Sequence, residues 1–279
     1  MWQLIRIELY KIFHRPRSYI GFVAIAILVS IIHLALYVDG PNYMQFFIQQ
    51  LEQSFNIQGK IINGNLVAYL ILQTLIVQMP LLVALVTGDL LSGEAATGTI
   101  RLLATKPVSR SSIVLAKFFA GSFYTVALVI WLGIISLGVG LLIFGRGDLI
   151  VLNSEQISIL RADDTLWRFG GAMLIAFLSL TVVASFSLLL SAFTDNSIGP
   201  IVGTMAVVII FTIVGTMEFP LFEKISPFLF TTHTIVWRSM FADPLPLDHI
   251  MQSVLILAGH VILFLGITLY YFNRKDILN

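Results

Sequence analysis

The five histidines are the side chains of this sequence best suited to bind a metal ion or to move a proton. They are His14, His33, His233, His249 and His260. No two of them lie four residues apart, the spacing that brings two imidazoles onto one helix face to hold zinc. His33 and His260 fall inside long apolar segments, where an ionisable side chain marks a functional site or simply hydrogen bonds to a backbone carbonyl. Both interpretations stay open, and the sequence predicts no metal site.

Motifs for covalent catalysis and for nucleotide binding are absent. The sequence contains no Gly-x-Ser-x-Gly elbow, no serine within a short step of a plausible base, and no phosphate-binding loop that ends in Gly-Lys-Ser/Thr. It also contains no cysteine, which excludes disulfides and thiolate metal sites. We therefore expect a chain that is not an enzyme and that holds no cofactor of its own.

The acidic residues do not form an ion relay through a membrane. Asp89, Glu94, Asp195 and Glu218 lie in connections or at the ends of apolar segments, whereas ion-coupled transporters usually carry carboxylates inside their spans. The apolar segments are instead aliphatic and aromatic. Such a lining suits helix packing, or an apolar or amphipathic cargo.

These residues are positioned by apolar segments that are each long enough to cross a bilayer, which takes about 20 mainly apolar residues in helical form. The chain is 58% hydrophobic and 11% charged, against about 25% charged in soluble domains. The sequence thus predicts an all-α polytopic membrane protein, a single domain over residues 1–279 with six transmembrane helices. The predicted spans are Tyr19–Val38, Leu66–Thr87, Phe118–Phe144, Phe169–Phe193, Ile198–Met217 and Ile250–Phe272.

The net charge of +1 hides an asymmetry between the two sides of the predicted membrane. With six spans, both termini, loop 88–117 and loop 194–197 share one side, and most bases fall there. Because bases near span ends favour the cytoplasmic side, we expect both termini to be cytoplasmic and the chain to lie in the plasma membrane. These bases are Arg6, Lys11, Arg15, Arg17, Arg101, Lys106, Arg110, Lys117, Arg274 and Lys275.

Residues 2–15 predict an amphipathic helix that Pro16 ends. A helix of this kind lies in the membrane interface, although an ordinary positively charged end that sets topology remains the alternative. The apolar face holds Trp2, Ile5, Leu9, Ile12 and Phe13, and the polar face holds Gln3, Glu8, Lys11, His14 and Arg15.

The sequence also predicts short elements in several connections between the spans. Met44–Phe55 repeats apolar residues at helical spacing, Asn153 or Ser154 is placed to cap a short helix in loop 145–168, and Phe219–Phe230 favours short or re-entrant helices. Gly199 and Gly203 form a small-residue face at the start of the fifth span. That face packs a helix within the chain or contacts another subunit, and both possibilities stay open.

The most specific stretch is the loop from Gly88 to Lys117. Glu94 favours the start of a short helix, the apolar residues Ile100, Leu102 and Leu103 flank Arg101, and Pro107 breaks the element. Ser109 or Ser111 then caps the helix that leads into the third span. A short and partly apolar helix of this kind suits docking to a soluble partner.

This loop resembles the signature of the type-2 ABC transporter permease family. The resemblance rests on Glu94, Gly98-Thr99-Ile100-Arg101-Leu102-Leu103, Pro107-Val108-Ser109-Arg110 and Lys117, with Glu8-Leu9-Tyr10-Lys11 before the first span and Phe272-Asn273-Arg274-Lys275-Asp276 after the last. It covers the whole chain in topology. Members are six-span membrane subunits of ATP-binding-cassette exporters.

The resemblance implies a role for each of these regions. Residues 2–15, with Trp2, Glu8 and Lys11, would be the interfacial connecting helix, and Phe219–Phe230 the short extracellular helices. Two ATPase subunits, encoded separately and holding ATP and Mg²⁺, would act with a second permease copy or a similar permease. The residues that would couple to the ATPase are Glu94, Thr99, Arg101, Leu102, Leu103, Pro107 and Arg110, with Asp195 as a smaller second contact.

Two other classes of function compete with an exporter subunit. The chain could be a non-transporting membrane anchor that recruits a cytoplasmic assembly, or an intramembrane enzyme, although no nucleophile and base pair supports the latter. Membrane lipids are expected partners and nucleic acid is not. The few polar groups in the spans leave lipids, peptides, antibiotics and hydrophobic drugs as candidate cargo.

Overall fold

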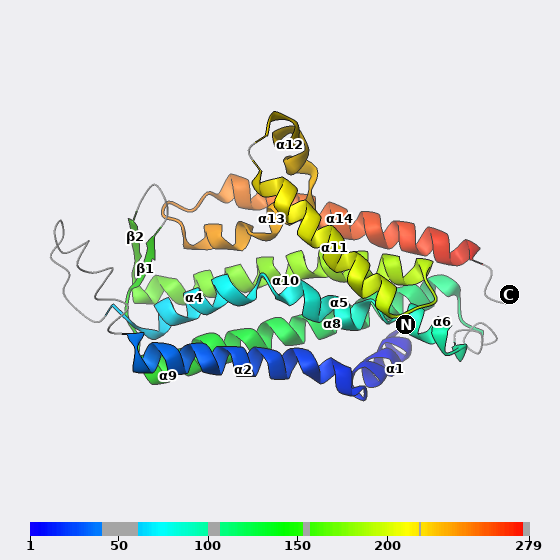
Figure 1. Ribbon diagram of the computed structural model, residues 1–279, viewed down its shortest axis with the longest axis horizontal. Helices are drawn as coiled ribbons and strands as arrows, with labels where there is room; N and C mark the ends of the chain where they lie inside the picture. The colour runs from blue at the N-terminus through cyan, green and yellow to red at the C-terminus, as the bar shows by residue number, and fades with distance from the viewer. Residues whose placement is uncertain (41–60, 100–106, 153–156, 218, 276–279) are drawn as a thin grey trace.

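The computed structural model describes residues 1–40, 61–99, 107–152, 157–217 and 219–275. Long helices lie side by side along the long axis of the molecule (Figure 1). Five helical segments are long and apolar enough to cross a membrane, and a bent pair of helices makes a sixth. The chain is therefore a predominantly helical membrane protein. The five are α2 (Pro16–Val38), α8 to α9 (Arg110–Phe144), α10 (Ala162–Phe193), α11 (Ile198–Thr216) and α14 (Leu247–Arg274).

The second predicted span is broken rather than straight. Its two halves, α4 (Gly64–Leu75) and α5 (Met79–Thr87), meet at an angle of 54°. Pro80 stands in the first turn of α5 and has no N–H to bond back to the preceding turn. Tight turns replace the regular pattern there, with Gln78 N donating to Leu75 O at 2.9 Å.

The third span also changes geometry along its length. It begins as α8 (Arg110–Gly133), widens into a π-helical turn η1 (Ile134–Val139) and ends as α9 (Gly140–Phe144). The helix starts eight residues before the predicted span at Phe118. Lys117, the last residue of loop 88–117, therefore lies two turns inside α8, as the predicted cap at Ser109 or Ser111 implies.

Helix α10 is the central helix of the bundle. In its most apolar stretch 67% of the residues are buried, against 11% in α11, 17% in α14 and 22% in α2. It packs against α5, α8, α11 and α14. Helices α2, α11 and α14 instead expose wide apolar faces, as expected of helices that contact lipid.

Short helices occupy the connections. They are α1 (Trp2–Phe13), α6 (Ser92–Ala96), α12 (Pro220–Ile225) and α13 (Phe230–Thr234), with the 3₁₀ turns η2 (Ser226–Phe228) and η3 (Val236–Phe241). The prediction of short helices in Phe219–Phe230 is confirmed. The predicted helix at Met44–Phe55 lies outside the described residues.

A β-hairpin stands where a short helix was predicted in loop 145–168. Strands β1 (Leu149–Leu152) and β2 (Ile157–Leu160) pair antiparallel, with Leu149 opposite Leu160. Leu149 and Val151 are buried, so the burial alternates with the period of a strand. The short helix predicted in this loop is not found at Ile157–Leu160, which form strand β2, and Asn153 and Ser154, predicted to cap it, lie outside the described residues.

The two ends of the bundle differ in construction. At one end the hairpin, η3 and the start of α10 enclose an aromatic cluster of Tyr69, Phe169, Trp237 and Phe241. At the other end lie α1 with the N-terminus, α6 and the end of α14 (Figure 1). The sequence assigns most of the bases to this second end, and its charged side chains form the candidate site.

Candidate functional site

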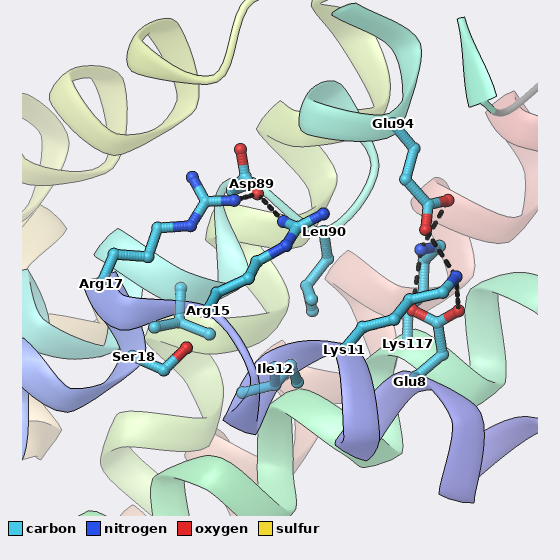
Figure 2. Close-up of a pocket in the computed structure, with 11 residues that line it drawn as sticks. Glu8, Lys11, Ile12, Arg15, Arg17, Ser18, Asp89, Leu90, Glu94 and Lys117 are labelled. Carbon is cyan, nitrogen blue, oxygen red and sulfur yellow. Dashed lines mark hydrogen bonds and ion pairs between the residues drawn. The ribbon is translucent and has the colours of Figure 1, made fainter. Parts of the chain in front are cut away.

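Four charged side chains close a ring between α1, α6 and α8 (Figure 2). Lys11 Nζ donates to Glu8 Oε1 at 2.6 Å and to Glu94 Oε1 at 2.8 Å. Lys117 Nζ donates to Glu8 Oε2 at 2.9 Å and forms an ion pair with Glu94 Oε2 at 2.8 Å. We call Glu8, Lys11, Glu94 and Lys117 the charge ring. Each lysine joins both carboxylates, so the ring has no net charge.

The charge ring is buried, and Lys11 is its most exposed member. Exposure is 0% for Lys117, 5% for Glu94 and 7% for Glu8. Burial by itself would raise the pKa of Glu94, but the nearby Lys117 and Lys11 outweigh it and hold that pKa below its usual value. Burial likewise opposes the charge of Lys11, and its hydrogen bonds to Glu8 and Glu94 nevertheless raise its pKa. The contacts within the ring thus favour the charged forms of Glu94 and Lys11.

Helix α1 delivers two members of the ring from one face. Glu8 and Lys11 stand three residues apart and are neighbours on the helix, and Ile5 and Ile12 are buried on the same side as Glu8. The predicted helix over residues 2–15 is confirmed over Trp2–Phe13, and Ile5, Leu9, Ile12 and Phe13 of its predicted apolar face are buried or pack against the core. Two of its residues lie differently from the prediction. Trp2 is 66% exposed, whereas Glu8 turns inward because it meets the buried Lys117.

A second charged contact joins the junction of α1 and α2 to the segment before α6. Arg15 and Arg17 both contact Asp89 Oδ2. The Asp89 side chain is 3% exposed, and the two arginine side chains are 39% and 33% exposed. A Cβ on Gly93 would come within 2.3 Å of Asp89 Oδ1, so only glycine at that position leaves room for this carboxylate.

Helix α6 is also fastened to the central helix α10. Ser191 Oγ accepts hydrogen bonds from the backbone N–H of Leu91 at 3.1 Å and of Ser92 at 2.8 Å. These groups are among the donors that a helix start leaves unpaired, so Ser191 caps α6 from a distant part of the chain. Segment 88–94 is consequently held by α1, α8 and α10 together.

The start of α8 contacts the end of α14 at the same end of the bundle. Ser109 Oγ caps α8 by accepting from Ser112 N at 3.2 Å, as predicted. Arg110 Nη1 donates to the carbonyls of Asn273 at 3.3 Å and Lys275 at 2.5 Å. Lys275 Nζ in turn donates to Asp195 Oδ1 at 3.0 Å.

Comparison with known families gives one match, which covers nearly all of this chain. Residues 22–278 match the family described as Protein of unknown function (DUF2705). The chain belongs to the DUF2705 family. No curated protein matches the sequence. The matched region of this DUF2705 protein takes in Asp89, Glu94 and Lys117, whereas Glu8 and Lys11 precede it.

The residues predicted to couple to an ATPase have different environments in the DUF2705 chain. Glu94 faces inward and belongs to the charge ring, while Thr99 is exposed and donates to the Glu94 carbonyl at 3.3 Å. Pro107 is exposed. Arg110 and Asp195 bond within the chain, although the Asp195 side chain stays 72% exposed. Arg101, Leu102 and Leu103 lie outside the described residues.

The small-residue face at the start of α11 is not uniform. A Cβ on Gly203 would lie 3.2 Å from Leu190 of α10, so Gly203 packs inside the chain. Gly199 is exposed, and a Cβ there would meet only Thr194 at 3.8 Å or more.

Sequence reasoning named Glu94 and Lys117 but did not place Lys117 inside the protein, and it gave no role to Ser191. One signal was available for Lys117. It stands among closely spaced apolar residues from Ile113 to Phe118, and a base in such a run needs an acidic partner if the helix is buried. No comparable signal marks Ser191, since its partners lie about 100 residues away.

The cavity between the charge ring and Asp89 holds about 10 Å³, roughly the volume that one water molecule needs. It cannot admit a substrate. Among the described residues, no three His, Asp or Glu side chains group to hold a metal ion. The contacts of the arrangement fasten segment 88–94 to the ends of α1, α2, α8 and α10.

Proposed function

We propose that this DUF2705 protein is the membrane permease subunit of an ABC exporter. It would move a hydrophobic or amphipathic substrate (lipid, peptide, antibiotic or drug) outward across the plasma membrane. ATP with Mg²⁺ would be bound and hydrolysed by two separately encoded ATPase subunits. A second permease copy or a similar permease would complete the transporter.

The charge ring is the observation that carries this proposal. A transmembrane subunit driven by a soluble motor needs a stiff connection from its exposed loop to its spans. Segment 88–99 has such connections, to α8 through Lys117, to α2 through Arg15 and Arg17, and to α10 through Ser191. Residues 96–99 are partly or fully exposed beside it.

The resemblance to the type-2 ABC transporter permease family also supports the proposal, and it does so through the charge ring. The residues that carry it include all four members of the charge ring, from three separate parts of the sequence. In this proposal, closure of the ATPases on ATP pushes on the exposed part of loop 88–117. The ring passes the movement to α1 and α8, and the bundle changes from inward-facing to outward-facing.

The test is co-purification with an ATPase encoded by a neighbouring gene. Arg101→Glu should abolish both co-purification and stimulated ATP hydrolysis, because it reverses the charge of one residue in the predicted docking loop. Arg146→Glu is the matched control, since it makes the same change on an exposed residue beyond α9, at the opposite end. Equal effects of the two substitutions would contradict the proposal.

ATP-dependent substrate movement in proteoliposomes then distinguishes the exporter from the alternative. A chain that binds the ATPase through loop 88–117 but moves no lipid, peptide or drug would be a membrane anchor that recruits the ATPase or a larger assembly.

A further inference from the structure

We propose that Arg15 and Arg17, at the start of α2, bind the phosphate group of an anionic phospholipid. The proposal concerns a different ligand from that of an ATPase-driven permease, and it stands whether or not the protein is an exporter. It rests on the charge balance at Asp89, on the uncapped start of α2, and on the exposed surface around the two arginines.

The charge at this junction is not balanced. Both guanidinium groups contact the same oxygen of Asp89, and Asp89 is the only acidic side chain found against either of them in the described part of the chain. Arg15 lies close enough to Arg17 for their like charges to repel. Each guanidinium has five N–H donors, so one carboxylate oxygen leaves most of them available. A further anion would relieve the repulsion and use these donors.

The first turn of α2 adds one favourable feature. Helix α2 has 23 residues, and no side chain caps its N-terminus, the end at which a helix dipole favours negative charge. The buried Ser18 Oγ lines the same cavity as Arg15, Arg17 and Asp89, but that cavity has room for about one water molecule. The anion would therefore be held by the two arginines at the surface and not inside the cavity.

The surroundings indicate that this anion belongs to a lipid. Tyr10 and Tyr19 are 63% and 49% exposed on either side of the junction of α1 and α2, and Trp2, at the other end of α1, is 66% exposed. Tryptophan and tyrosine collect at the level of the lipid headgroups. The rest of α2 exposes aliphatic side chains such as Val23 and Ile27, as expected of a helix that continues into the acyl chains. Arg15 and Arg17 thus lie at the level of the phosphates.

Lipid retention by the purified full-length protein tests the proposal. Native mass spectrometry would compare bound phosphatidylglycerol with phosphatidylcholine. We expect preferential retention of phosphatidylglycerol, weakened about fivefold by Arg15→Gln or Arg17→Gln and reduced by salt. The conservative Arg15→Lys and Arg17→Lys variants should keep most of the binding. Arg146→Gln, at the other end of the bundle, should keep all of it.

The Asp89→Asn variant distinguishes lipid binding by the two arginines from a purely structural role of their contact with Asp89. Asp89 competes with the lipid phosphate for the same guanidinium groups, so its neutralisation should strengthen phosphatidylglycerol binding. If Asp89→Asn fails to fold, the two glutamine variants still decide the matter. Unchanged retention in both would overturn the proposal. Displacement of the lipid by millimolar inorganic phosphate would assign the site to free phosphate and overturn its assignment to lipid.

Discussion

Lys117 and Glu8 stand 109 residues apart in the sequence, and Lys117 Nζ lies 2.9 Å from Glu8 Oε2. This contact ties the N-terminal helix to the third span through two buried side chains. Since Glu94 shares the same lysine, the loop after the second span is tied to both. The stability and any coupling of this end of the bundle should therefore depend on a few identifiable atoms.

Replacing Lys117 by methionine should destabilise the protein by about 3–5 kcal/mol, because Glu8 and Glu94 would remain buried with only Lys11 to pair them. Chemical unfolding in detergent measures the loss. Lys275→Met is the control, since its partner Asp195 is 72% exposed and a surface pair contributes about 1 kcal/mol or less. Similar losses for both variants would mean that the charge ring is not the stabilising element.

Stability should depend on pH in a direction fixed by the ring. The pKa of Glu94 is lowered from 4.5, so its stabilisation is complete above about pH 4.5 and is lost as the pH falls through the lower folded-state value. The pKa of Lys11 is raised from 10.5, so its stabilisation is complete below that pH and is lost as the pH rises through the higher folded-state value.

The acid side gives the sharper measurement. Thermal unfolding between about pH 3 and pH 7 should show a steeper loss for the unmodified chain than for Glu94→Gln, because the variant has no carboxylate to protonate at this position. Parallel curves for the two proteins would remove Glu94 from the explanation of acid sensitivity.

Ser191→Ala should destabilise the protein by about 1–2 kcal/mol, since the N–H groups of Leu91 and Ser92 would lose their acceptor. Ser179→Ala on the same helix is the control. Ser179 donates only to the Ile175 carbonyl of its own helix, which keeps its backbone partner. Hydrogen exchange at Leu91 and Ser92 should accelerate in the first variant and not in the second.

Gly64→Ala should destabilise by about 1–3 kcal/mol through overpacking. A Cβ at this position would approach the backbone of Leu141 to 2.6 Å, and backbone atoms in two packed helices cannot yield as a flexible side chain does. Gly259→Ala in α14 is the control, because nothing lies within 4 Å of its added Cβ. Melting temperatures of the two variants should shift differently, and a loss for Gly259→Ala as large as that for Gly64→Ala would contradict the packing argument.

The hydrophobic pattern was sufficient to predict the helices, because long apolar runs have few other stable forms in a membrane. It could not predict the bend between α4 and α5, since a proline inside a span, such as Pro80, is compatible with a straight or a broken helix. It also missed the β-hairpin, where four-residue strands give too short a pattern to outweigh a capping residue.

The candidate site was predicted as a set of residues but not as an arrangement. Glu94 was predicted to start a short helix and, from the resemblance, to couple to an ATPase, and neither prediction included its buried contacts within the charge ring. Most of the apolar face of α1 was predicted correctly, but amphipathicity does not tell lipid from protein, so the exposure of Trp2 and the burial of Glu8 were missed. Trp2 and Ile5 are both apolar, yet only the second is buried.

The order of the ring members along the sequence also bears on biosynthesis. Lys117 is the last of the four to leave the ribosome, and both of its acidic partners have already been synthesised when it appears. The positive charge of Lys117 can thus be paired with these carboxylates as soon as its helix forms beside them. Truncation or masking of the first dozen residues should consequently delay membrane integration of the third span rather than of the first.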